Sequence, residues 1–285
     1  MNILITGNLS SLATTFAKEF AKQKHRVVLV SPDADKLNPK PKNTILYSID
    51  PARDIFRDAM SAYRFDIVVF ISTREEQLNE RVDPDTGRQL DALQNTLELS
   101  RHGNLRRFFY ISSTEIYGNC GNKSEDTEPE PASLNGHILV TGEQYCRYYQ
   151  HEFGLNVTIL RLPYVYGPEE KKGLLYRLVE GCKNHNTVLI PGNPGRPCNF
   201  LHENDIADFM NRVIEDEYAP TSPVINLSSS ITVTNEQISR ILGKYFPDAS
   251  FQFEEATKVF TSPAIVATAK NVFDWVDLHD LNTEL

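Results

Sequence analysis

The residues best suited to chemistry follow an apolar run within residues 108–118, FFYISSTEIYG. Aromatic and β-branched residues of the kind found in buried strands lead there into the hydroxyls of Ser112 and Ser113 and the carboxylate of Glu115. A hydroxyl and a carboxylate at the end of a strand can bind a polar substrate and exchange protons with it. We therefore expect an active-site loop here.

A second chemical site is expected near the amino terminus. An apolar run at residues 2–6 ends at Gly7, and apolar residues at helical spacing begin near Leu12. Strand, tight turn and helix in this order are the setting of a dinucleotide-binding loop, because the start of a helix offers unpaired N–H groups to a phosphate. A strand, turn and helix with no ligand is the alternative, and the sequence leaves both readings open.

Strands and helices alternate along the first half of the chain. Short apolar runs at residues 26–30, 44–49, 66–71, 107–112 and 156–160 alternate with amphipathic stretches at residues 12–24, 55–63, 83–102 and 134–153. This pattern predicts a parallel sheet with helices on both faces, an α/β fold with a doubly wound Rossmann-type sheet. Past Gly167 the pattern loosens into strands at residues 187–190, 224–227 and 250–253 and helices at residues 174–183, 204–215 and 233–245, with a loop at residues 191–197. We expect a Rossmann-like region over residues 1–165 and a smaller α/β substrate lobe over residues 166–285, interleaved as one compact unit.

The composition argues against several classes of function. The 285 residues carry 29 Lys and Arg against 38 Asp and Glu, and a net charge of −9 disfavours nucleic-acid binding. No apolar run approaches the roughly 20 residues of a membrane helix. The four cysteines form no CxxC pair and have no histidine at metal-ligand spacing, so we expect reduced thiols in a cytoplasmic protein and no metal site.

Several segments resemble the extended short-chain dehydrogenase/reductase superfamily, in particular its NAD-dependent epimerase/dehydratase family. Residues 6–13 are similar to the family's TGxxGxxG loop, residues 112–118 to SSxxVYG, residues 160–168 to LRxxNVYGP and residues 200–207 to FVHVDDVA. The resemblance implies a Rossmann fold and NAD or NADP as cofactor. It also implies that Ser113 bonds the reacting sugar group, and Glu115 matches a glutamate of dehydratase-like and decarboxylase-like members.

The resemblance fails at the residues that carry the family's proton. Members use a Tyr and a Lys in a YxxxK motif, in which the lysine lowers the pKa of the tyrosine and holds the nicotinamide ribose. Alignment on Glu143 places Asn135 at the tyrosine position and Leu139 at the lysine position, and neither side chain titrates. His137 is nearby, but at two residues from Asn135 it points to another face of the helix.

The expected cofactor contacts are partly retained. Gly7 keeps the tight turn of the dinucleotide loop, whereas Ser10 stands at the second glycine position. Ser31 ends the second strand, where an acid usually binds the adenosine ribose, and it does not separate NAD from NADP. Asp50 matches the family aspartate that meets the adenine, and capping of the following helix is its alternative role.

The expected substrate pocket departs further from the family. Tyr164 replaces the substrate-facing asparagine, and its larger side chain would crowd a sugar diphosphate. Cys198 replaces the arginine that usually binds the diphosphate, and Arg196 lies two residues before it.

These losses concentrate on cofactor, proton and substrate contacts. They favour a degenerate family member without the standard catalysis, a pseudoenzyme acting as a ligand-binding, protein-interaction or regulatory module. The family implies a setting in nucleotide-sugar or exopolysaccharide metabolism. The first alternative is an active NAD(P)-dependent nucleotide-sugar epimerase or dehydratase with Glu115 or His137 as its base, and the second is a structural dimerisation domain.

The family also implies partners. Members often pair through the two helices matched here by residues 83–102 and 134–153, so a homodimer is expected, with packing onto the chain's own sheet as the alternative for their apolar stripe. Residues 273–281 resemble the family's LGWxPxxxL, after which members usually continue with a closing helix, but this chain stops at Leu285. Either this closing helix is absent or the chain is one domain of a longer polypeptide, so a covalently linked further domain or an unknown partner protein is an expectation as well.

Overall fold

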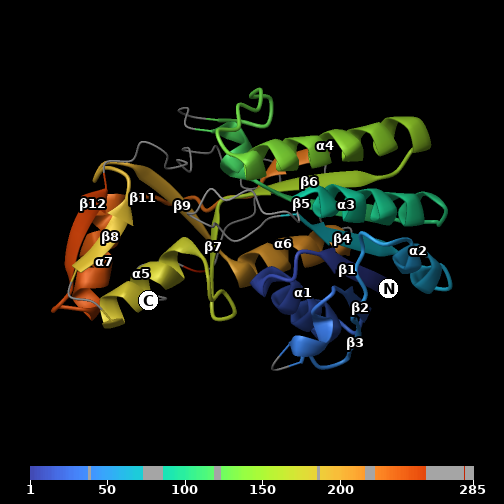
Figure 1. The fold of residues 1–285 in the computed structure, drawn as a ribbon, viewed down its shortest axis with the longest axis horizontal. Helices are drawn as coiled ribbons and strands as arrows, with labels where there is room; N and C mark the ends of the chain where they lie inside the picture. Colours follow the sequence, from blue (N-terminus) through green and yellow to red (C-terminus); the bar gives the residue numbers. More distant parts are fainter. Residues whose placement is uncertain are drawn as a thin grey trace.

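A seven-stranded parallel sheet dominates the structure, a computed structural model that describes residues 1–37, 40–72, 86–118, 123–184, 187–215, 222–254 and 279. The strand order is β10-β6-β5-β4-β1-β2-β3 (Figure 1). The strands are β1 (Asn2–Gly7), β2 (Arg26–Val30), β3 (Thr44–Tyr47), β4 (Ile67–Ile71), β5 (Arg107–Ser113), β6 (Val157–Leu162) and β10 (Val224–Asn226). The order reverses beside β1, which confirms the predicted doubly wound Rossmann-type sheet.

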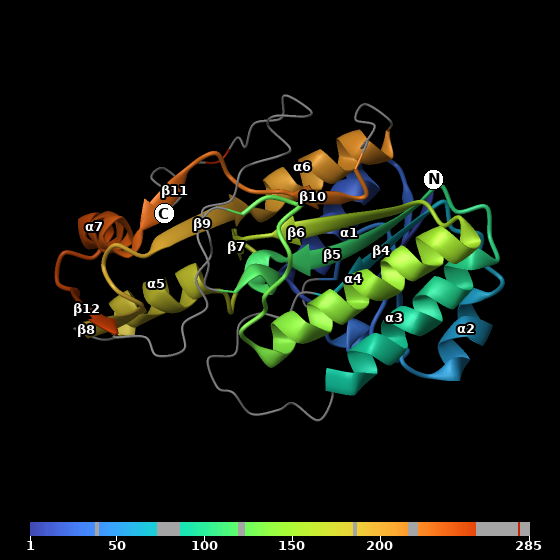
Figure 2. The ribbon, with the colours of Figure 1, turned by 90° about the horizontal axis from the view of Figure 1, so that it is seen from above.

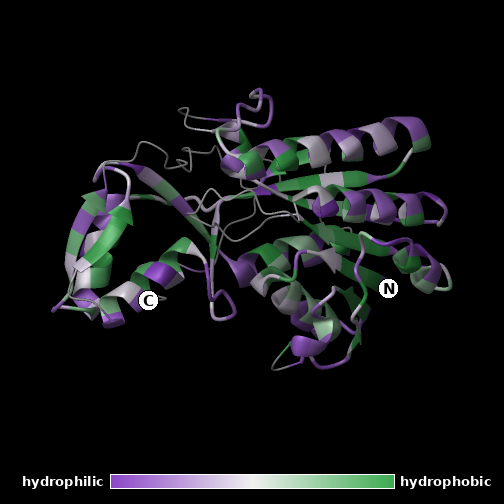
Figure 3. Cartoon of the chain, viewed as in Figure 1, coloured by the Kyte–Doolittle hydropathy of each residue, from purple (hydrophilic) through white to green (hydrophobic). Residues whose placement is uncertain are grey.

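Helices cover both faces of this sheet (Figure 2). One face carries α1 (Ser11–Lys22) and α6 (Glu203–Ile214), and the other carries α2 (Asp54–Met60), α3 (Thr86–Arg101) and α4 (Leu134–Phe153). Because side chains alternate along a strand, Ile3 and Ile5 pack under α1 and α6 while Leu4 packs on the opposite side. Figure 3 shows hydrophobic residues on these strands and hydrophilic residues on the outer sides of the helices.

Two residues of the apolar stripe expected at a dimer interface are buried in the core of the chain itself. Leu93 and Leu97 of α3 are almost fully buried in the core cluster beneath α2, α3 and α4. The alternative reading, packing onto the chain's own sheet, therefore holds for these two residues. Among large apolar side chains of α4, Tyr148 and Phe153 are 56% and 43% exposed.

A smaller α/β part lies beyond the carboxyl edge of the large sheet (Figure 1). It contains a three-stranded sheet, a two-stranded sheet and two helices: β7 (Tyr164–Tyr166), β8 (Thr187–Pro191), β9 (Pro197–His202), β11 (Thr232–Thr234), β12 (Ser250–Glu254), α5 (Leu174–Asn184) and α7 (Asn235–Tyr245). Strands β7, β9 and β11 are absent from the sequence prediction. The helix predicted from Val233, with a start near Thr234 and Asn235, is confirmed, but it begins two residues later, at Asn235. Thr232–Thr234 pairs with β9 instead, and Thr234 then caps α7 in a capping box with Gln237. The domain division at residue 165 stays a prediction.

A buried ion pair ties β6 to α4. The Arg161 guanidinium donates from Nε and Nη2 to the two oxygens of Glu143, at 3.0 and 2.6 Å, and both side chains are at most 3% exposed. A third donor, Nη1, lies 2.6 Å from the hydroxyl of Tyr117 in the short helix η2 (Thr114–Tyr117). The Ser112 hydroxyl at the end of β5 donates to Glu143 at 2.7 Å. One pair thus fixes two strands, one helix and the loop that carries Glu115.

We predict that Arg161→Met lowers the free energy of unfolding by about 3–5 kcal/mol, because it leaves the Glu143 carboxylate buried without its counter-charge. Urea unfolding of the two proteins measures the difference. The double variant with Arg161→Met and Glu143→Leu removes both charges and should recover much of the loss. A double variant no more stable than the single one would contradict this account.

A second buried carboxyl lies where the chain enters the smaller part. Glu203 begins α6 and is 1% exposed, and its Oε1 accepts a hydrogen bond from the Glu169 backbone N–H at 2.8 Å. Gly167, with φ +151°, passes so close that a Cβ there would lie 2.5 Å from the Glu203 Cγ. Burial, joined by the charges of Glu169 and Glu170, raises the pKa of Glu203 from 4.5 to about 7.

Glu203 should make the protein less stable as the pH rises from about 4.5 to about 7. The folded protein keeps this proton in that window and the unfolded chain has released it, so the free energy of unfolding falls by up to roughly 3 kcal/mol. We predict that the stability of Glu203→Gln relative to the wild type increases between pH 5 and pH 8 in urea unfolding. His202, whose pKa burial and His279 lower to about 4, titrates in both proteins and cancels in the comparison. A difference that stays constant over this range would refute the assignment.

Candidate active site

The loop between β1 and α1 has the geometry of a dinucleotide loop. Gly7 has φ +96°, and a Cβ there would lie 2.3 Å from the Ile71 carbonyl oxygen, so the turn requires glycine. The Asn8 side chain donates to the Ser72 carbonyl at 3.1 Å and holds the turn against β4. Ser10 is the N-cap of α1, yet its side chain makes no cap hydrogen bond. The side chain of Ser10 therefore does not cap the first-turn N–H groups of α1, and this suits a phosphate ligand.

The two residues expected at the adenosine end lie at the same edge of the sheet. Ser31 is buried directly after β2, and its backbone N–H donates to the Tyr47 carbonyl at 3.2 Å. Asp50 follows β3, where one carboxylate oxygen accepts from the Ala52 N–H at 3.0 Å. The other oxygen pairs with the Arg88 guanidinium of α3 and lies 3.6 Å from the Arg53 Nε. The carboxylate of Asp50 is thus shared between a local turn and an arginine of α3.

The expected catalytic residues come together at the start of α4. Ser113 caps helix η2 by accepting the Glu115 N–H at 3.2 Å. The Glu115 carboxylate accepts from the Asn135 Nδ2 at 2.6 Å and, through its other oxygen, from the Ser133 hydroxyl. Ser133 also caps α4 by accepting the Gly136 N–H at 2.8 Å. The structure therefore joins the proposed base to the residue at the family's tyrosine position.

The residue that we expect at the family's lysine position is apolar. Leu139 is fully buried in a small apolar cluster with Ile116 and Tyr117. The buried Tyr110 hydroxyl, which also bonds Ser72 at 2.8 Å, lies 3.4 Å from the Leu139 carbonyl oxygen. His137 is exposed, and its Nδ1 contacts the Ser133 carbonyl oxygen at 2.8 Å. Its ring thus sits on the outer side of α4, as its spacing from Asn135 predicted.

The residues expected at the substrate diphosphate turn inward. Arg196 is 4% exposed and donates to the Pro191 carbonyl at 2.9 Å and to the Tyr164 hydroxyl at 2.6 Å. Cys198 is fully buried, with its Sγ 3.5 Å from the Asn235 Oδ1. Asn235, which the sequence analysis missed, also donates to the Pro191 carbonyl at 2.8 Å. Asn235 is the first residue of an amphipathic helix, and an asparagine there is usually interpreted as a helix cap. The sequence therefore showed no sign of its contacts with Pro191 and Cys198.

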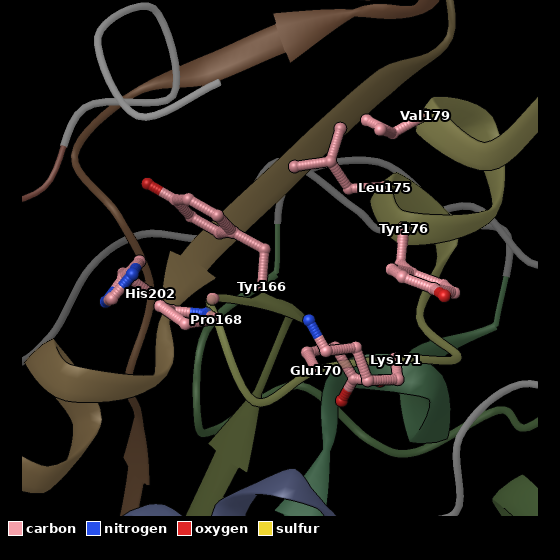
Figure 4. A pocket seen from close by; sticks show the side chains of 9 residues that line it. Tyr166, Pro168, Glu170, Lys171, Leu175, Tyr176, Val179 and His202 are labelled. Carbon is pink, nitrogen blue, oxygen red and sulfur yellow. The ribbon is translucent and has the colours of Figure 1, made fainter. Parts of the chain in front are cut away.

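A cavity of about 220 Å³ lies between the loop after β7 and helix α5. Figure 4 shows Tyr166 and His202 on one side of it and Leu175, Tyr176 and Val179 of α5 on the other. Gly167, Pro168, Glu170 and Lys171 complete its lining. The Glu170 carboxylate reaches past this cavity to α1, where it accepts a hydrogen bond from the Ser11 hydroxyl at 2.7 Å. The sequence analysis missed this contact, because 159 residues separate its partners.

No helix of the described residues is both long and apolar enough to cross a membrane. The same residues contain no group of three or more His, Cys, Asp or Glu side chains that could hold a metal ion.

Comparison with known proteins gives consistent matches. Residues 3–228 match the model of the NAD dependent epimerase/dehydratase family. An uncharacterized UDP-glucose epimerase, YtcB of Bacillus subtilis (strain 168), is 25% identical over 229 residues, which cover 75% of this chain and 72% of YtcB. Protein CapI of Staphylococcus aureus is 25% identical over 239 residues, 77% of this chain and 71% of CapI.

A solved structure shows the same fold. UDP-glucuronic acid 4-epimerase from Bacillus cereus, in complex with UDP-glucuronic acid and NAD, superposes with a TM-score of 0.83 at 20% identity, over 100% of this chain and 96% of that one. The parallel sheet, the glycine turn and the SSTEIYG loop of this chain agree with the family match over residues 3–228. This chain belongs to the NAD-dependent epimerase/dehydratase family of the extended short-chain dehydrogenase/reductase superfamily.

Proposed function

We propose that this chain binds NAD and a UDP-linked sugar and acts on the sugar as an epimerase or dehydratase, with Glu115 as its base. The family match supports the nucleotide-sugar class, as do the relatives described as a UDP-glucose epimerase and as a UDP-glucuronic acid 4-epimerase. When bound, the nicotinamide supplies a hydride acceptor. The residues of the chain must then hold the sugar and move its proton.

The observation that carries this proposal is the fixed carboxylate of Glu115. Its hydrogen bonds to Asn135 and Ser133 hold it at the start of α4, in place of the family's tyrosine. An ionised carboxylate accepts protons, so Glu115 can take one from a sugar carbon or hydroxyl. The Ser113 oxygen already accepts the Glu115 N–H, and its own hydrogen can be donated to the sugar.

The residues present fit a dinucleotide in part. The turn at Gly7 and the first turn of α1 would hold the pyrophosphate, and Ser31 would contact the adenosine ribose. Leu139 cannot replace the lysine that holds the nicotinamide ribose in other members, because it is apolar and fully buried. We therefore infer weaker cofactor binding than in members with the YxxxK motif, and no preference for NAD over NADP from Ser31.

A second candidate is a binding module without turnover, which would act as a ligand-sensing or regulatory protein in nucleotide-sugar or exopolysaccharide metabolism. Two specific observations favour it. Asn135 cannot accept the proton that the family's tyrosine handles, and Leu139 lies sealed in apolar packing with Ile116 and Tyr117. Both candidates share the same ligands, so they differ in turnover alone.

We predict that wild-type protein with NAD converts at least one UDP-sugar of a panel that includes UDP-glucose, UDP-galactose and UDP-glucuronic acid. Glu115→Gln should lower kcat by about 10²- to 10⁴-fold, the usual contribution of a general base, with little change in the Kd for the sugar nucleotide. His137→Ala is the matched comparison, and it should keep turnover because its ring faces outward. Binding heat for NAD and a UDP-sugar without conversion by the wild type would favour the second candidate.

We further propose a homodimer through α3 and α4. Tyr148 and Phe153 of α4 stay exposed after the chain has folded, and the Arg101 guanidinium of α3 lies 4.7 Å from the Phe153 ring centroid. Aromatic and arginine side chains are the residues that most often anchor protein interfaces. A structural role for this pair of helices does not depend on catalysis.

Sedimentation equilibrium at tens of micromolar should give twice the chain mass, and Tyr148→Asp should shift the protein to monomer, because it would bury a charge in the interface. Leu189→Asp is the control, since Leu189 of β8 is 52% exposed on a different part of the chain. An unaltered mass for Tyr148→Asp, or an equal shift for Leu189→Asp, would place the interface elsewhere.

We propose that the protein is located in the cytoplasm, which is a reducing compartment. Cys146 and Cys182 form no disulfide within the described residues, and the Cys146 thiol is buried. Free buried thiols persist where the surroundings are reducing.

A further inference from the structure

The Glu170 carboxylate is built into the start of the dinucleotide loop. Its Oε2 accepts the Ser11 hydroxyl at 2.7 Å, and Ser11 is the first residue of α1. Its Oε1 accepts the backbone N–H groups of Lys172 and Gly173 at 2.8 and 2.9 Å. The residue is 6% exposed. Both oxygens are thus held, and the carboxylate cannot turn away without breaking three hydrogen bonds.

The loop that carries Glu170 is fastened to α1 at a second point. Glu169 forms an ion pair with Lys18 of α1 at 2.6 Å, and its backbone N–H bonds Glu203 of α6. Helix α5 begins at Leu174, directly after this loop. The position of the smaller part is therefore linked to the first turn of α1 through residues 169–173.

The electrostatics of this arrangement oppose a dinucleotide. The start of a helix attracts anions through its N–H groups and its partial positive charge. A pyrophosphate bound there would lie near the buried carboxylate of Glu170, which is hydrogen-bonded to the Ser11 side chain of the same turn. Screening between two such charges is weak when one of them is shielded from water.

We propose that Glu170 is a built-in competitor of the cofactor's pyrophosphate, and that it couples the affinity for NAD to the position of the smaller part. This inference rests on the proposed binding of NAD at the Gly7 loop. Tight cofactor binding then requires the loop at residues 169–173 to withdraw the carboxylate from α1, a movement that also displaces the start of α5. A sugar nucleotide that moves this loop would raise the affinity for NAD, and the reverse holds by linkage.

Isothermal titration of the full chain with NAD tests the competitor. Glu170→Gln keeps the shape and removes the charge, and we expect a Kd at least ten-fold lower than that of the wild type. Glu169→Gln removes the same charge one position earlier on the same loop, away from Ser11, and it should change the Kd by less than two-fold. Ser11→Ala removes one of the three hydrogen bonds that hold the carboxylate but keeps its charge, so it should lower the Kd by less than Glu170→Gln does. Thermal unfolding of each variant shows that the comparison is made on folded protein.

The outcomes separate this inference from the proposed function. If the wild type and Glu170→Gln bind NAD equally well, the competitor is overturned while the cofactor site stands. If neither the wild type nor Glu170→Gln binds NAD at about 5 mM, five-fold above a Kd of about 1 mM, both the competitor and the proposed cofactor site fail. A gain for Glu169→Gln equal to that for Glu170→Gln would overturn the inference too, because the overall charge of the loop would then explain it. A Kd for Ser11→Ala above that of the wild type would also contradict the inference. The inference is supported if Glu170→Gln binds NAD and the wild type does not.

Discussion

The buried pair of Arg161 and Glu143 is the contact on which the rest of the structure depends. Its bidentate geometry joins β6 to α4, and the third donor of the guanidinium reaches Tyr117 behind the active-site loop. Two charges removed from water are stable only while each has the other, so this contact permits little displacement. The relative positions of Ser113 at the end of β5 and Asn135 at the start of α4 follow from it, and with them the placement of Glu115.

The start of α4 shows how a family site can change while its frame persists. A tyrosine and a lysine would both need water or cofactor around their polar ends, whereas Leu139 is sealed against Ile116 and Tyr117. Asn135, which we expect at the tyrosine position, donates to Glu115, and we propose that this carboxylate takes the role of the phenol. A carboxylate is charged near neutral pH without help from a lysine, which makes the two replacements mutually consistent.

In the smaller part too, side chains that we expect at a binding site make contacts within the protein. Arg196 is hydrogen-bonded to Tyr164 and Pro191, and Cys198 lies against Asn235, so both side chains expected at a diphosphate stabilise the lobe itself. The loop after β7 adds Glu170 to the first turn of α1. A buried carboxylate thus lies beside the first turn of α1, where we propose that the cofactor's pyrophosphate binds.

The sequence by itself determined the large sheet. Its strands, such as residues 66–71, are apolar at nearly every position instead of alternating with polar residues, which is typical of a parallel sheet covered on both faces. The sequence also determined the tight turn at Gly7 and the place of the SSTEIYG loop after a buried strand, because residue type and order along the chain are sufficient to predict these two features. Only the tertiary structure decided the pairing of short strands such as β7 and β11, whose three residues gain stability from their neighbours and not from their own pattern. Likewise, contacts between Glu115 and Asn135, between Arg196 and Tyr164, and between Glu170 and Ser11 join residues 20 to 159 positions apart, and no local rule specifies such partners, since side-chain burial and direction arise from packing.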